Sequence, residues 1–343
     1  MPEQEPFAYF GGMLATRLVE VSTDPAVLDG SGWWAVQLTY ENEFVAARFA
    51  DVNFGSHPAG PWPGVDVSEW GSSMSRDDYV LAVSSVRESI ARGDVYQANI
   101  CRVLRTTVSE RHQIAALGAL LQREHPSPHG GSIVLPGHEV AVVSASPELF
   151  LRRDGDVIES SPIKGTARTP EGFLEKDSAE NVMIVDLVRN DIGQVSEAGS
   201  IEVPSLLSVE SHPGLVHLVS TVRGRLRPDV GWRQILSATF PPGSVTGAPK
   251  SSALRIISEL ERAPRGPYCG AIGWVDADKR QAELAVGIRT FWQRGDSLHF
   301  GTGAGITWGS DPAQEWDETG LKARRLLEVA AQDTSSSSTR EAQ

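Results

Sequence analysis

GTGAGITWGSDPAQEWDETGLKA, at residues 301–323, joins a predicted β-strand to a predicted α-helix. The strand covers 296–307 and follows another strand-like run at 281–294, so the two form a meander. The helix covers roughly 312–331. GTGAGI is glycine-rich, but it lacks the glycine spacing of a dinucleotide-binding turn and no helical pattern follows it directly. A dinucleotide site is therefore not expected here.

Two acidic pairs occupy predicted helices at a spacing of three residues. They are Glu315 with Glu318, and Asp177 with Glu180 in a helical run at 175–195. Residues three apart lie on one helix face, so each pair can direct its carboxylates at one point. Such pairs could hold a hard cation such as Mg²⁺, although they are also typical of solvated helix faces. Lys322 shares the face of Glu318 and could form an ion pair with it or bind a carboxylate.

The remaining elements alternate between strand and helix patterns. Residues 1–75 form a β-rich segment that ends in Gly and Pro clusters, and a helix follows from Ser75 to Gly93. Strand-like runs at 131–161 and further helices at 232–240 and 251–263 give a mixed α and β pattern. The polar tail at 332–343 is expected to be disordered.

Composition limits the classes of function. The 343 residues suit one large domain or two fused halves, with 40% apolar and 22% charged residues. A net charge of -13 argues against binding to nucleic acid or anionic membranes. Only Cys101 and Cys269 are present, which argues against a disulfide framework or zinc site and predicts two packed thiols. Without a signal-peptide pattern, a cytoplasmic location is expected.

Four further features could belong to a functional site. Arg289 lies in the apolar run ELAVGIRTF, where it needs either an anionic ligand or an internal acid as partner. The segment FPPGSVTGAPKSSAL (240–254) offers hydroxyls and backbone donors before a helix, as a simple capped turn also would. His217 is either a core histidine or a site residue. Lys164, before a Gly turn, is either surface charge or a desolvated nucleophilic amine.

Nine ordered strings together resemble the chorismate-utilising enzymes, which include anthranilate, aminodeoxychorismate, isochorismate and salicylate synthases. The resemblance covers about residues 76–330. The strings are GDVYQAN, SASPELF, PIKGTARTP, SAENVMIVDLVRNDIG, HLVSTVRG, FPPGSVTGAPK, RGPYCGAIG, GIRTF and GAGITWGSDPAQEWDETGLKA.

The resemblance implies an α+β fold with two large, mostly antiparallel sheets facing each other, helices outside and the active site between the sheets. A catalytic domain would cover 76–331, with the segment 1–75 packed on it and the tail at 332–343 outside.

The resemblance also implies roles for individual residues. Glu180 and Glu318 would be the Mg²⁺ ligands, with Asp177 and Glu315 supporting them. Arg289 would bind the enolpyruvyl carboxylate of chorismate, and Lys322 would help neutralise the ring carboxylate. The other residues expected around the substrate are Gln97, Tyr268, Gly303, Gly305, Ser244, Thr246 and the active-site histidine His217.

Three further residues bear on the reaction. Glu148 matches the general acid that protonates the departing C4 hydroxyl. Gln97 stands where the water-using members carry a lysine base, which favours ammonia as nucleophile. Lys164 is the third residue of the string PIKGT, and anthranilate synthases resemble PIAGT at this place. In the aminodeoxychorismate branch this lysine is thought to attack C2. The implied activity is amination of chorismate in para-aminobenzoate and folate biosynthesis.

Two alternatives stay open, an anthranilate synthase component that also eliminates pyruvate, and a non-catalytic subunit that binds chorismate. Neither cysteine lies in the nucleophile turn of a glutamine amidotransferase, so a separate amidotransferase partner is implied.

Overall fold

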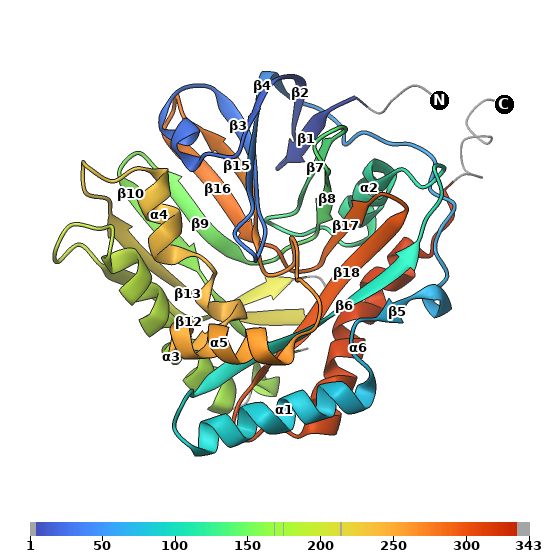
Figure 1. The fold of residues 1–343 in the computed structure, drawn as a ribbon. Helices are drawn as coiled ribbons and strands as arrows, with labels where there is room; N and C mark the ends of the chain where they lie inside the picture. The colour runs from blue at the N-terminus through green and yellow to red at the C-terminus, as the bar shows by residue number, and fades with distance from the viewer. Residues whose placement is uncertain (1–4, 168, 174, 213–214, 335–343) are drawn as a thin grey trace.

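The computed structural model describes residues 5–167, 169–173, 175–212 and 215–334. The fold is α+β, as expected: a large antiparallel sheet is flanked by α-helices (Figure 1). The α-helices of the described residues are α1 (Arg76–Ala91), α2 (Ile114–Glu124), α3 (Glu175–Gly193), α4 (Trp232–Thr239), α5 (Lys250–Leu260) and α6 (Pro312–Ala330).

The strands of the described residues number 18. They are β1 (Phe7–Phe10), β2 (Met13–Ser22), β3 (Trp33–Leu38), β4 (Phe44–Phe54), β5 (Gly71–Ser72), β6 (Gln97–Thr107), β7 (Gly131–Leu135), β8 (Val140–Ser144), β9 (Leu149–Asp154), β10 (Val157–Ser161), β11 (Ile163–Ala167), β12 (Glu202–His212), β13 (Leu215–Arg225), β14 (Gly247–Ala248), β15 (Ala271–Asp276), β16 (Gln281–Val286), β17 (Thr290–Arg294) and β18 (Ser297–Ile306).

The strands form two arms of one hydrogen-bonded sheet, and the arms correspond to the two expected sheets. The first arm has the order β12, β13, β10, β9, β16, β15, β3, β4. The second has the order β2, β1, β7, β8, β17, β18, β6, and the pairing of β2 with β4 joins the arms. The N-terminal segment thus supplies β1 to β4 at the junction.

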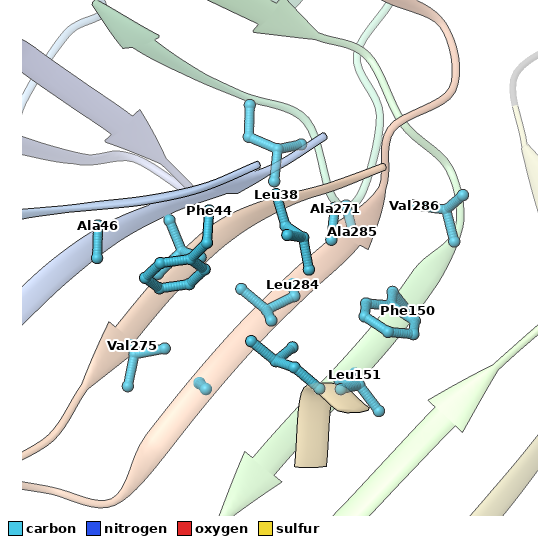
Figure 2. Close-up of a cluster of buried hydrophobic side chains, with 14 of the residues drawn as sticks. Leu38, Phe44, Ala46, Phe150, Leu151, Ala271, Val275, Leu284, Ala285 and Val286 are labelled. Atoms are coloured by element: carbon cyan, nitrogen blue, oxygen red, sulfur yellow. The ribbon is translucent and has the colours of Figure 1, made fainter. Parts of the chain in front are cut away.

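Apolar side chains from both arms are buried under the helices. One cluster combines Leu38, Phe44, Phe150 and Leu284 of the first arm (Figure 2) with residues of α3 and α4. A second cluster packs α2 and α6 on the second arm, and a third packs α1 and α5 on β6 and β18. Each fully buried Leu or Phe contributes on the order of 1.5–3 kcal/mol, so these contacts fix α3 and α6 relative to the sheet.

Local signals explain where the helices of the site begin. At α6 the carboxylate of Asp311 accepts hydrogen bonds from the backbone N–H groups of Ala313 and Gln314, and Pro312 occupies the first turn. At α1 the hydroxyl of Ser75 accepts from the N–H of Asp78. The helices expected at 75–93, 175–195, 232–240, 251–263 and 312–331 are confirmed within a few residues.

The elements that were not predicted include α2, β6 and β12. Of the tail expected at 332–343, residues from 335 onward lie outside the described residues. No helix in the described ranges is long and apolar enough to cross a lipid bilayer.

Candidate active site

A cavity of about 740 Å³ lies where α3, α6 and both arms of the sheet meet. Its walls include β13 of the first arm and β11, which pairs with β13, together with β18 of the second arm and the turn at Gly243–Val245. A cavity of this size suits a small organic ligand. Among the residues predicted from the sequence, those that line it are Glu148, Lys164, Asp177, Glu180, His217, Ser244, Tyr268, Arg289, Gly303, Gly305, Glu315, Glu318 and Lys322.

The two acidic pairs face this cavity from different helices. Asp177 and Glu180 belong to α3, and Glu315 and Glu318 belong to α6. Within the described ranges, no three His, Cys, Asp or Glu side chains form a ready-made metal cluster. Mg²⁺, however, is commonly held by one or two carboxylates together with water and substrate oxygens. The acids of this cavity therefore fit a hard cation shared with an anionic ligand.

Basic groups lie directly beside these acids. The ammonium of Lys322 is 2.6 Å from a carboxylate oxygen of Glu318 and donates to the backbone carbonyl of Gly303 at 3.2 Å. The same lysine was expected either to pair with Glu318 or to bind a carboxylate, and the structure shows the ion pair. Both side chains are half exposed, so this pair contributes little stability by itself and is open to exchange with a ligand.

Lys164 is partly buried at the start of β11, and its ammonium donates to the carbonyl of Ser244 at 2.8 Å. Loss of hydration lowers the pKa of Lys164, while the carboxylates of Glu180 and Glu148 oppose this shift. Its predicted alternative as a surface charge is excluded by this position. A lysine with a lowered pKa has a larger neutral fraction and so is a better nucleophile than an exposed one.

Glu148 lies next to this lysine and is 4% exposed. Burial raises the pKa of the Glu148 carboxyl, although the Ser244 hydroxyl and the Lys164 ammonium oppose the rise. The backbone of Glu148 is fixed on both sides: its N–H donates to Ser146 Oγ at 3.2 Å, and its carbonyl accepts from the N–H of Val286 at 3.0 Å. A carboxyl group held in the protonated form can donate a proton to a departing oxygen.

Gln97 is the first residue of β6 and contacts Glu180, but it is not among the described residues that line the cavity. Its Nε2 donates weakly to a carboxylate oxygen of Glu180 at 3.4 Å, and its side chain is buried. The Oε1 atom has no hydrogen-bond partner among the described residues. A Cβ atom at Gly305 would collide with this amide and would lie 3.8 Å from Lys164 Nζ. Glycine at 305 therefore allows Gln97, Lys164 and β18 to approach one another closely.

Two predicted polar residues have different environments. His217 is 2% exposed on β13 and reaches the cavity, where it stands opposite Thr166 of β11. Thr246 is fully buried and does not line the cavity among the described residues. Its hydroxyl donates to the carbonyls of Pro242 and Gly243, so it stabilises the turn from within. The structure thus brings Ser244, but not Thr246, to the expected position.

Arg289 faces the cavity without an acidic partner. Its guanidinium Nη1 is 3.2 Å from Nε2 of His125, and it forms no ion pair within the described residues. Burial lowers the pKa of Arg289, and the negative charge of Glu148 opposes this shift. A partly buried guanidinium whose neighbour is a neutral ring still lacks compensation for its charge. Of the two partners expected from the sequence, an anionic ligand is therefore the one that fits.

Sequence reasoning missed two basic residues at this end of the cavity, His125 and Arg325. His125 is the C-cap of α2, an element that was not predicted. Arg325 is one helical turn beyond Lys322 on α6, so its spacing from Glu318 and Lys322 already placed it on the same face. That spacing was the signal that could have identified it.

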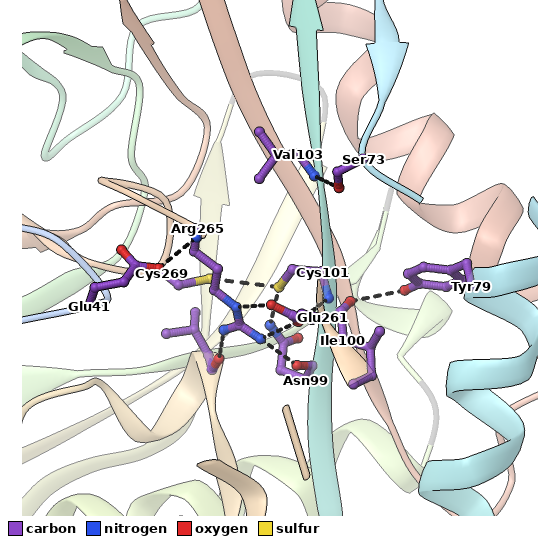
Figure 3. A network of polar contacts seen from close by, with 11 residues as sticks. Glu41, Ser73, Tyr79, Asn99, Ile100, Cys101, Val103, Glu261, Arg265 and Cys269 are labelled. Atoms are coloured by element: carbon purple, nitrogen blue, oxygen red, sulfur yellow. Dashed lines mark hydrogen bonds and ion pairs between the residues drawn. The ribbon is translucent and has the colours of Figure 1, made fainter. Parts of the chain in front are cut away.

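A buried polar network supports the wall of the cavity (Figure 3). Arg265, whose side chain is 1% exposed, pairs with Glu261 at 2.7 Å and donates to the carbonyls of Val245 and Asn99. Val245 and Asn99 both line the cavity. The thiols of Cys101 and Cys269 lie 4.0 Å apart in the same network and are both free and buried, as expected.

The fold and the cavity define a class of protein. An enzyme that acts on a small carboxylated molecule uses groups of the kind found here. They are paired carboxylates, a desolvated lysine, a buried carboxyl acid and an arginine without an acidic partner among the described residues. The chain belongs to the family of chorismate binding enzymes, whose family model matches residues 34–328.

Two kinds of enzyme occur among the relatives of the chain. The chain is 40% identical over 274 residues to "Anthranilate synthase component 1 1" of Haloarcula marismortui, which covers 76% of this chain and 55% of that protein. It is 39% identical over 274 residues to "Aminodeoxychorismate synthase component 1" of Klebsiella aerogenes, covering 76% of this chain and 59% of the relative. The chain thus spans little more than half the length of these curated relatives.

Solved structures of other proteins share the fold of this chain. The menaquinone-specific isochorismate synthase of Escherichia coli superposes with a TM-score of 0.79 at 18% identity, covering 96% of this chain and 89% of that one. Anthranilate synthase component I from Streptococcus pneumoniae superposes with a TM-score of 0.76 at 23% identity, covering 94% and 89%. At these identities the similarity concerns the fold alone.

Proposed function

We propose that the chain is the synthase component of an aminodeoxychorismate synthase, which converts chorismate and ammonia to 4-amino-4-deoxychorismate in para-aminobenzoate and folate biosynthesis. The observation that carries this proposal is the position of Lys164. Its amine is desolvated inside the cavity and lies next to a buried carboxyl acid, Glu148. This arrangement places a nucleophile and a proton donor of the protein beside the same bound substrate.

In the first step, the neutral amine of Lys164 forms a bond to C2 of chorismate. Two ring double bonds shift, the C4–O bond breaks, and Glu148 donates the proton with which the hydroxyl leaves as water. In the second step, ammonia adds at C4 and returns a proton to the carboxylate of Glu148, the double bonds shift back, and the bond between C2 and the lysine nitrogen breaks, which releases the neutral amine. The enolpyruvyl group is retained, and Lys164 is regenerated.

The carboxylates of chorismate would be held at two places in the cavity. Arg289 binds the enolpyruvyl carboxylate, with Tyr268 and the backbone of Gly303 and Gly305 beside it. Lys322 helps to neutralise the ring carboxylate. Glu180 and Glu318 would be the ligands of a Mg²⁺ ion, with Asp177 and Glu315 in support, because their carboxylates line the same cavity. Such an ion, when bound, supplies positive charge for the ring carboxylate.

The remaining polar residues would orient the substrate. His217 and Ser244 reach the cavity beside Lys164 and Glu148. Gln97 cannot act as a base toward water, since an amide does not accept a proton at neutral pH. Ammonia needs no such base, because its lone pair is available without deprotonation. The neighbourhood of Lys164 therefore suits ammonia better than water as the second reactant.

Ammonia would come from a separate glutamine amidotransferase. The name "component 1" of the relatives supports a second component, and the two cysteines of this chain are both buried beside Arg265 rather than exposed in a nucleophile turn.

A second candidate function is that of an anthranilate synthase component, which would also eliminate pyruvate. The relative with 40% identity carries that name. A product assay separates the two functions. Purified chain is incubated with chorismate, Mg²⁺ and high ammonium at mildly alkaline pH, and the products are resolved by mass. We expect a product that keeps the enolpyruvyl group and carries an added amine. Anthranilate with pyruvate would refute the proposal in favour of the second candidate, and unchanged chorismate would refute both.

A further inference from the structure

The basic end of the cavity contains a histidine with no role in the proposed reaction. His125 follows the last residue of α2, and its backbone N–H donates to the carbonyl of Leu121, which fixes it as the helix cap. The imidazole is partly buried, and its Nε2 lies 3.2 Å from Nη1 of Arg289. A guanidinium nitrogen can only donate, so the imidazole nitrogen must be the acceptor. This contact joins α2 to the strand segment that carries Arg289.

The backbone of Arg289 is also constrained. Its φ angle is 52°, in the left-handed region that side-chain-bearing residues rarely adopt. The conformation is held because the carbonyl of Arg289 accepts from the N–H of Ala145 at 3.0 Å, immediately before β17 begins. Strained residues persist where the surrounding structure determines them and are often found at ligand sites. The backbone and the tip of Arg289 are thus both fixed, the tip by His125.

The charges around His125 keep its ring neutral. The groups that act on it are the guanidinium groups of Arg289 and of Arg325 on α6. Burial, followed by these two positive charges, lowers the pKa of His125 to about 4. At neutral pH its Nε2 lone pair is therefore available and the ring proton is on Nδ1. A positively charged side chain here would repel Arg289, and an acid would compete with the ligand for it.

We propose that His125 is a positioning residue, whose neutral imidazole accepts a hydrogen bond from Arg289 and holds the guanidinium toward a carboxylate of the substrate. The inference rests on the proposed function, because it takes chorismate as the ligand. His125 itself does not touch the reacting atoms. It acts through Arg289, by reducing the number of orientations that the guanidinium must lose when the carboxylate binds.

The test measures chorismate binding by titration calorimetry with Mg²⁺ present and ammonia absent, and every chain compared, including the one taken as wild type, carries Lys164→Ala, so that neither the covalent step nor turnover contributes. His125→Leu removes the acceptor, and His125→Gln keeps an acceptor oxygen at a similar distance from the backbone. A hydrogen bond to a charged group corresponds to about a tenfold to hundredfold change in affinity. We expect His125→Leu to weaken binding by that factor, and His125→Gln to stay within about threefold of the wild type.

The matched control is His138→Leu, the same change at an exposed turn between β7 and β8, which should leave binding unchanged. A double-mutant cycle with Arg289→Lys tests whether His125 acts through Arg289. We expect His125→Leu to have little further effect in the Arg289→Lys background, which a general structural role would not explain.

Wild-type affinity in His125→Leu, or fully additive losses with Arg289→Lys, would overturn the proposal. Failure of the proposed function can be distinguished from failure of this inference. A chain that binds chorismate but forms no aminated product would fail the product assay, and the binding cycle would still show whether His125 acts through Arg289.

Discussion

The substitution Glu261→Ala tests the buried ion pair that supports the cavity wall. Glu261 accepts three hydrogen bonds, from Arg265 Nε at 2.8 Å, Arg265 Nη2 at 2.7 Å and the backbone N–H of Cys101 at 2.7 Å (Figure 3). The side chains of Arg265 and Glu261 are 1% and 8% exposed. Removing the carboxylate leaves a buried guanidinium with no counter-charge, because its other acceptors are the carbonyls of Val245 and Asn99.

Breaking a buried ion pair in this way costs about 3–5 kcal/mol. We expect the free energy of unfolding of Glu261→Ala, measured by denaturant titration, to fall by that amount. The matched control is Glu259→Ala in the last turn of α5, two residues before Glu261, whose partner Arg255 is also four residues away. Those side chains are 57% and 60% exposed. The control should therefore remain within about 0.5 kcal/mol of the wild type.

The double variant with Arg265→Met should recover part of the loss, since the unpaired charge disappears while the carbonyls of Val245 and Asn99 lose their donor. A Glu261→Ala chain within about 1 kcal/mol of the Glu259→Ala chain would refute the assignment of this pair as a support of the cavity wall.

Three further predictions concern the reaction. Lys164→Ala should lose most aminodeoxychorismate formation, because the amine in the cavity is removed; activity close to wild type would contradict the nucleophile assignment. Glu318→Gln should raise the Mg²⁺ concentration needed for half-maximal activity, whereas an unchanged Mg²⁺ titration would show that this residue is not a ligand. At a fixed concentration of neutral ammonia, activity should rise and then fall with pH, because the amine of Lys164 must have lost its proton while the carboxyl of Glu148 keeps its own; the lowered pKa of Lys164 and the raised pKa of Glu148 both enlarge the fraction of the chain in this state. If the residual activity of Glu148→Gln still falls at high pH, Glu148 is not the cause of that fall.

Helical periodicity predicted which acidic residues share a helix face, but it could not predict that the two acidic pairs line the same cavity. A spacing of three residues placed Asp177 with Glu180, and Glu315 with Glu318, on one face of each helix. Nothing in that spacing shows that α3 and α6 face the same cavity. Their meeting depends on the pairing order of the sheet, in which α3 packs against β13 of the first arm and α6 against β18 of the second. The family resemblance supplied this relation.

His125 was missed because α2 was missed. The sequence IAALGALLQRE (114–124) is a short segment that is apolar from Ile114 to Leu121, with its polar residues together at the end, so few polar positions mark a helical period along it. Gln113 at its N-cap makes no side-chain hydrogen bond to the helix, which removes the usual signal for a helix start. The strand β12 was obscured by Pro204 and by two shifts of register against β13.

Thr246 shows the limit of transferring a role by position alone. Its hydroxyl occurs in the expected turn, two residues after Ser244, but the turn directs it to the carbonyls of Pro242 and Gly243. Side-chain direction in a turn depends on backbone angles, and φ and ψ of Thr246 are -116° and -80°. The identity of the residue alone does not determine those angles.

The most direct test of the account concerns the covalent step at Lys164. The chain is incubated with chorismate and Mg²⁺ without ammonia, quenched in acid and weighed intact by mass spectrometry. The account predicts a species heavier than the chain by the mass of chorismate less one water, located at Lys164 by peptide fragmentation and absent from Lys164→Ala. An unmodified chain, from a preparation that aminates chorismate when ammonium is supplied, would contradict it.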